Sequence, residues 1–197
     1  MADSLYLSLW FSDFGIPEMF AHALGVMRQF PFSRQLPGIT NLAVHPISWN
    51  EATILEQRFH PGAAPEEAMA IAVGLVHEDD ACIFEANWDL WSPQNNPGEW
   101  TLQPSLVRFI LRGEEFDEGE SETQGGVQVD FGLDTPFLHE ELELTGDVES
   151  RVRINVRLLV EFINNVEKNS GTSARLLWSE SEENLAQKLV NRLQKVQ

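Results

Sequence analysis

The sequence predicts an α+β protein made of two closely coupled halves. Strand-like and helix-like patterns alternate over residues 4–91, and a second mixed set follows residue 100. Residues 92–98, SPQNNPG, collect prolines, asparagines and a glycine, which are typical of a turn. This turn is too short to be a free linker, so we expect the two halves to pack together.

The first half is predicted from two periodicities. Residues 5–11 alternate leucine or phenylalanine with polar or aromatic residues, which predicts a strand. A helix follows at residues 16–27, because Pro17 and Glu18 suit its first turn. The same patterns predict strands at residues 39–47, 52–60 and 82–90 and a second helix from residue 64. This β-α-β-β-α-β order is that of a split βαβ unit, so we expect a ferredoxin-like half at residues 1–95.

The second half, residues 96–197, is predicted in the same way. Two alternating segments indicate strands, and two later segments carry apolar residues at helical spacing. The elements are strands at 105–111 and 127–133, a helix at 148–168, a strand at 174–178 and a helix that begins at 179–182. We therefore expect a β-β-α-β-α half packed against the first.

The charge of the chain excludes some partners. It holds 31 acidic and 13 basic residues, a net charge of −18. Proteins that bind phosphate backbones gain affinity by replacing counterions with Lys and Arg, so we expect no binding to nucleic acid or to anionic membranes. No window approaches the roughly 20 apolar residues that span a bilayer. Since the start at Met1 also lacks a basic or apolar leader, we expect a cytoplasmic protein.

The first candidate site is the polar face of the predicted amino-terminal sheet. If the alternating leucines pack under the helices, the opposite face presents carboxylates, a guanidinium, an imidazole and aromatic rings. The candidate residues are Tyr6, Trp10, Glu56, Arg58, His60, Glu85, Asn87 and Asp89. Three alternatives stay open: a pocket for a small ligand or for catalysis, a face covered by the second half or by a homodimer partner, and a solvated face.

Catalysis on this face defines the alternative function. A small hydrolase or isomerase would use Glu85 or Asp89 as a base and His60 or Tyr6 as its partner, with Glu56 nearby. An open pocket containing at least two of the four residues Glu56, His60, Glu85 and Asp89 would favour this enzyme. The chain shows no nucleophile elbow, phosphate loop or dinucleotide fingerprint, so we expect no cofactor and favour a non-catalytic protein.

The second candidate site is the acidic run from Glu114 to Glu122, with six carboxylates in nine residues. Like charges at this density repel one another and extend the backbone, which predicts a mobile loop between two strands. The functional alternative is an electrostatic contact for a basic protein partner, since such contacts accelerate association. The contact candidates are Glu114, Glu115, Asp117 and Glu118.

Metal binding and thiol chemistry are not expected. The five histidines lack the spacings by which one helix or strand chelates zinc, and the acidic run lacks the EF-hand pattern. The single cysteine, Cys82, alternates with apolar residues and has acidic neighbours, so we interpret it as a small core residue. The sequence thus predicts a non-catalytic acidic protein that binds a protein partner or small ligand through its polar sheet face or its acidic run.

Overall fold

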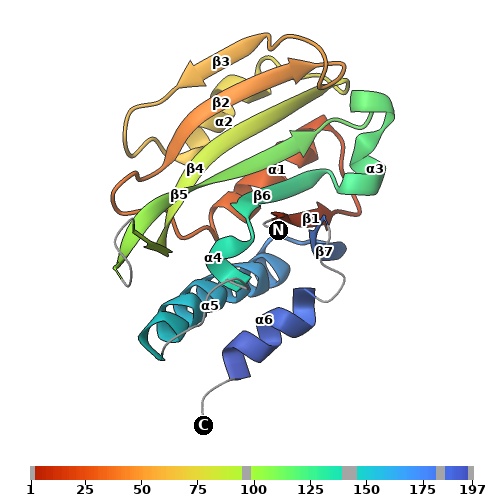
Figure 1. The fold of residues 1–197 in the computed structure, drawn as a ribbon. Coiled ribbons are helices and arrows are strands. Elements are labelled where there is room, and N and C mark those ends of the chain that lie inside the picture. The colour runs from red at the N-terminus through yellow and green to blue at the C-terminus, as the bar shows by residue number, and fades with distance from the viewer. Residues whose placement is uncertain (1–2, 95–98, 139–145, 181–184, 195–197) are drawn as a thin grey trace.

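The computed structural model describes residues 3–94, 99–138, 146–180 and 185–194, and it confirms the α+β class (Figure 1). The first elements are β1 (Ser4–Trp10), α1 (Ile16–Met27), β2 (Ile39–Pro46), β3 (Leu55–Arg58), α2 (Pro65–Val73) and β4 (Asp80–Pro93). The others are β5 (Trp100–Arg112), η1 (Phe116–Glu118), α3 (Glu120–Gln124), β6 (Val127–Leu133), α4 (Thr135–Leu138), α5 (Gly146–Asn169), β7 (Ala174–Ser179) and α6 (Leu185–Gln194). Residues 95–98 of the predicted turn and 181–184 at the predicted start of the last helix lie outside the described residues.

The alternating sequence of β4 shows how the core forms. Phe84, Ala86 and Trp88 have no exposed surface, while Glu85 and Asp89 on the other side of the strand are partly exposed. Helices α1 and α2 lie behind the sheet in Figure 1, on the side of these buried residues, and α5 packs against α1 and β4. Aromatic rings fill the layer between sheet and helices: Phe30, Trp88, Phe109, Phe131, Phe137 and Phe162.

The strand order differs from the ferredoxin-like arrangement that we expected. The seven strands form one antiparallel sheet in the order β3-β2-β4-β5-β6-β1-β7. A split βαβ unit would place its first strand among the other strands of residues 1–95. The β4–β5 hairpin pairs along its whole length, and β2 takes the other edge of β4. No edge of β4 is left for β1, which lies instead between β6 and β7 of the second half.

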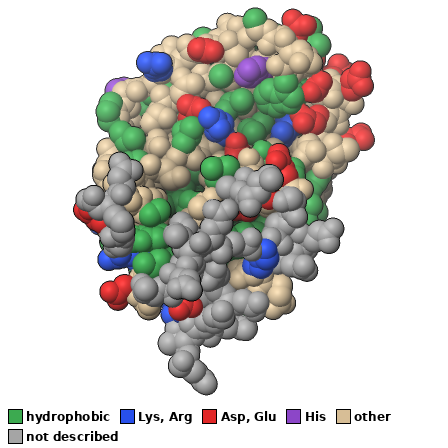
Figure 2. All heavy atoms as spheres, viewed as in Figure 1, with side chains coloured by type: hydrophobic (Ala, Val, Ile, Leu, Met, Phe, Trp, Pro, Cys, Tyr) green, Lys and Arg blue, Asp and Glu red, His purple; other side chains and the backbone are tan. Residues whose placement is uncertain are grey.

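The opposite face of the sheet is the one seen in Figures 1 and 2. Hydrophobic side chains lie there among scattered Lys or Arg and Asp or Glu side chains (Figure 2). Within the described residues, the second half extends the sheet through β5, β6 and β7 and adds α5 to the layer that holds α1. No helix in the described ranges is both long enough and apolar enough to cross a membrane.

Candidate functional site

The acidic run is here called the acidic segment (residues 114–122). The sequence predicted an extended loop, but the segment is folded. Its residues form η1 and α3, between β5 and β6. Backbone hydrogen bonds tie it to neighbouring loops, from the Glu115 amide to the Glu78 carbonyl at 2.9 Å and from the Asp117 amide to the Ile47 carbonyl at 2.8 Å. Phe116 is fully buried, and its ring meets the ring of Trp49 edge-on at 4.8 Å. These contacts supply the local order that charge repulsion alone would oppose.

A buried arginine anchors the same segment from below. Arg112, only 3% exposed, donates from Nε to Glu120 Oε2 at 2.8 Å and from a terminal nitrogen to Gln128 Oε1 at 2.9 Å. Trp49 donates to the same Glu120 oxygen at 2.7 Å, and the guanidinium lies 5.6 Å from the Trp49 ring centre. Burial lowers the pKa of Arg112, and the adjacent Glu120 carboxylate opposes that shift. Glu120 therefore stabilises the fold by pairing with Arg112 and Trp49, and is not free to contact a partner.

The other carboxylates of the acidic segment face outward. Glu114, Glu115, Glu118 and Glu122 are exposed, and Asp117 is half-buried. Figure 2 shows Asp and Glu side chains gathered at the edge of the molecule that carries α3 in Figure 1. The four contact candidates from the sequence thus lie on one anchored piece of surface, and three of them are exposed to solvent.

The polar sheet face brings some of its predicted residues together. The guanidinium of Arg108 lies between two carboxylates, 3.1 Å from Glu85 and 3.5 Å from Asp130. Tyr6 stacks on Trp178 with ring centres 4.7 Å apart. The strand register explains these contacts, because Glu85 and Asp130 are the partners of Arg108 on its two sides. Trp178 is likewise the partner of Tyr6 in the β1–β7 pair. The single positive charge of Arg108 thus offsets part of the negative charge of the two carboxylates.

The remaining residues of the predicted face lie in separate surroundings. The exposed His60 is 3.3 Å from Glu67 of α2, and Glu56 accepts a hydrogen bond from Thr53. Asp89 accepts hydrogen bonds from the Ser33 hydroxyl and the Arg34 amide. Arg58 is exposed at the edge strand β3, whereas Asn87 is buried and its carbonyl accepts the Ser33 amide. The four catalytic candidates each have different neighbours.

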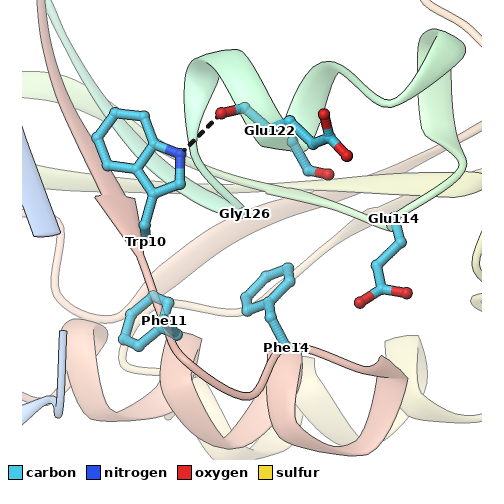
Figure 3. A pocket seen from close by; sticks show the side chains of 7 residues that line it. Trp10, Phe11, Phe14, Glu114, Glu122 and Gly126 are labelled. Carbon is cyan, nitrogen blue, oxygen red and sulfur yellow. Dashed lines mark hydrogen bonds between the residues drawn. The ribbon is translucent and has the colours of Figure 1, made fainter. Parts of the chain in front are cut away.

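A pocket of about 320 Å³ lies between the end of β1 and the acidic segment (Figure 3). Its lining residues are Trp10, Phe11, Phe14, Glu114, Ser121, Glu122 and Gly126. The pocket joins Trp10 and Glu114, which the sequence placed in two different candidate sites. It contains none of the four catalytic candidates. Phe11 and Phe14 were not predicted as site residues, and Glu122 belonged to the acidic run without being named as a contact candidate.

Local packing fixes the shape of this pocket. Trp10 donates from Nε1 to the carbonyl oxygen of Glu122 at 3.0 Å, which joins β1 to α3 (Figure 3). Phe11 stacks on His22 at 4.1 Å. A Cβ on Gly126 would lie 2.3 Å from the Phe14 ring, so only glycine leaves room for that ring. This close approach is a signal that a single sequence does not reveal, because it depends on contact across more than a hundred residues.

No known protein family, curated protein or solved structure matches this chain in the comparisons made. Within the ranges that the structure describes, no three His, Cys, Asp or Glu residues gather in a group that could hold a metal ion. The acidic segment and its pocket thus present carboxylate oxygens and aromatic rings to a ligand.

Cys82 is fully buried on the core side of β4, as predicted. Burial raises the pKa of its thiol strongly, and the nearby Asp80 carboxylate raises it further. We expect a disulfide reagent to label Cys82 in the folded protein far more slowly than in denaturant, because the thiolate is the reactive form. Absorbance of the released thiolate measures this rate. A cysteine placed at the exposed Ser12, in a Cys82→Ala background, should react at once; equal rates for the two thiols would contradict the prediction.

Proposed function

We propose that this chain is a non-catalytic binding protein whose acidic segment docks a basic protein partner. The observation that carries this proposal is that exposed carboxylates stand on a segment held in place by Arg112 and Phe116. A surface that is already ordered loses little conformational entropy when it binds. The unneutralised charge attracts a basic partner over a distance and accelerates the encounter.

Two features make this site a better choice than the polar sheet face. On the sheet face, Arg108 offsets Glu85 and Asp130, so the field above it is reduced. The catalytic candidates of that face are paired with different neighbours, which gives no support to the hydrolase or isomerase alternative. A protein is favoured over nucleic acid as the partner, because a net charge of −18 repels a phosphate backbone.

Selection from a library of short random peptides tests the proposal. The intact protein is the bait, and the selected peptides are expected to be enriched in Lys and Arg. The variant Glu115→Gln/Glu118→Gln removes two exposed charges that lie outside the pocket lining. We expect it to slow the association of a selected peptide by about fivefold at low salt, since steering depends on the local field. Stopped-flow fluorescence of a labelled peptide measures that rate.

A matched variant controls for net charge. Glu161→Gln/Glu180→Gln removes the same number of exposed carboxylates from α5 and from the residue that follows β7. It should bind the peptide as the unmodified protein does. The effect of Glu115→Gln/Glu118→Gln should vanish near 1 M salt, where the Debye length is about 3 Å. Selected peptides without a basic excess, or equal effects of the two variants, would refute the proposal.

A further inference from the structure

The pocket beside the acidic segment differs from the rest of that surface in having aromatic walls. Trp10, Phe11 and Phe14 come from the end of β1 and the turn after it, and their rings lie around one hollow (Figure 3). Glu114 and Glu122, both exposed, line the side formed by the acidic segment. The lining includes no Lys, Arg or His. Ring surface and negative charge therefore meet in one concave site.

From this geometry we infer that the pocket binds a single organic cation, the guanidinium or ammonium group of a basic side chain on the partner. The inference rests on the proposed function and specifies what that partner inserts. The negative face of an aromatic ring attracts a cation, and a guanidinium also stacks well on such rings because it is planar and weakly hydrated. The carboxylates of Glu114 and Glu122 supply acceptors for its N–H groups.

Size and position agree with this occupant. A volume of about 320 Å³ lies at the lower end of small-molecule sites, which suits one side-chain head group with part of its stem. Glu114 and Glu122 are the first and last residues of the acidic segment, so a basic peptide that crosses the segment passes the pocket. An anion would be repelled by both carboxylates, and an uncharged apolar group would gain no attraction from them.

Small molecules with the same butyl chain and different charges test whether the pocket recognises positive charge or only molecular shape. The probe is n-butylguanidinium, with n-butanol as the neutral counterpart and butyrate as the anionic one. The indole N–H signal of Trp10, assigned by its loss in Trp10→Phe, reports on the pocket in a two-dimensional NMR spectrum of the full chain. We expect n-butylguanidinium to shift this signal saturably and the two counterparts to leave it in place. Equal shifts by n-butylguanidinium and n-butanol would overturn the inference.

Two pairs of substitutions on the same segment give the matched control. Glu114→Gln/Glu122→Gln removes the pocket carboxylates, and we expect it to weaken n-butylguanidinium binding by about fivefold, since each exposed ion pair contributes modestly because solvent screens it. Glu115→Gln/Glu118→Gln changes the net charge equally but lies outside the lining, so binding should stay within about twofold. Equal weakening by both pairs would overturn the inference, because general attraction would then suffice.

The two proposals fail in different ways. If selected peptides respond to Glu115→Gln/Glu118→Gln but n-butylguanidinium leaves Trp10 unchanged, the acidic segment binds a partner and the pocket inference is wrong. If n-butylguanidinium binds and no basic peptide is selected, the proposed function fails and the cation is a free small molecule. If both bind and n-butylguanidinium displaces the peptide, the pocket holds a basic side chain of the partner.

Discussion

Glutamine in place of Glu120 is expected to lower the free energy of unfolding by about 3 kcal/mol, because it leaves the buried Arg112 charge without its ion-pair partner. The amide oxygen of glutamine still accepts hydrogen bonds from Arg112 and Trp49, so the change isolates the charge. Urea unfolding of the purified variant measures the loss. Binding of basic peptides should weaken too, since the acidic segment loses an anchor.

Removing both charges should restore much of this stability. Arg112→Met/Glu120→Gln removes both charges of this pair, and an apolar replacement for a buried ion pair is often close to neutral. We expect the double variant to be more stable than Glu120→Gln alone, and a double-mutant cycle gives the coupling. Glu122→Gln makes the same change at an exposed position of α3 and should shift stability by no more than about 0.5 kcal/mol. Additive losses in the cycle would show that the pair does not anchor the segment.

Trp88→Ala is expected to lower the free energy of unfolding by about 4 kcal/mol, since it removes a large aromatic side chain from the core. Trp88 is fully buried, and its ring lies 5.3 Å from Phe131, 5.6 Å from Phe30 and 5.8 Å from Phe137. These rings come from β6, from the turn after α1 and from α4, so the cavity would weaken contacts on three sides. Denaturant unfolding followed by circular dichroism measures the change.

Trp88→Phe provides the control. The Trp88 indole nitrogen has no hydrogen-bond partner within the described part of the chain, so replacing it by a phenyl ring sacrifices no such bond there. The ring contacts are largely kept, and we expect a loss of about 1–2 kcal/mol from the smaller volume. If Trp88→Phe destabilised as much as Trp88→Ala, the size of the cavity would not explain the effect, and the prediction would be wrong.

Local sequence patterns identified the long strands and helices but did not show which strands lie side by side, and they missed the short helices η1, α3 and α4. The alternation around Phe84 and Trp88 identified β4 and its buried face, and Pro17 with Glu18 placed the start of α1. Pairing of β1 with β6 and β7 depends on which sheet edges stay free once the β4–β5 hairpin has formed. Periodicity within a strand carries no information on that competition, so the ferredoxin-like expectation failed.

For the candidate site too, the sequence showed the residues but not their contacts. The charge of the acidic segment could be read directly, but its folding could not, since Arg112 and Trp49 lie outside the run. Trp10 and Glu114 were each singled out, yet their meeting in one pocket requires β1 to lie beside the chain that leads into β6. Gly126 was not singled out from the sequence, while in the structure it makes room for Phe14.

The position of β1 also determines when the sheet can be completed. Its hydroxyl at Ser8 accepts a hydrogen bond from Trp178, a residue 170 positions further along the chain. Closing a flexible loop of that length opposes folding by an entropic term on the order of 5 kcal/mol, and contacts of such sequence separation slow folding. During synthesis, the native strand partners on both edges of β1 are therefore made much later than β1 itself. The Trp10 wall of the pocket can take its place only after α3 and β6, more than a hundred residues further along the chain, have been synthesised.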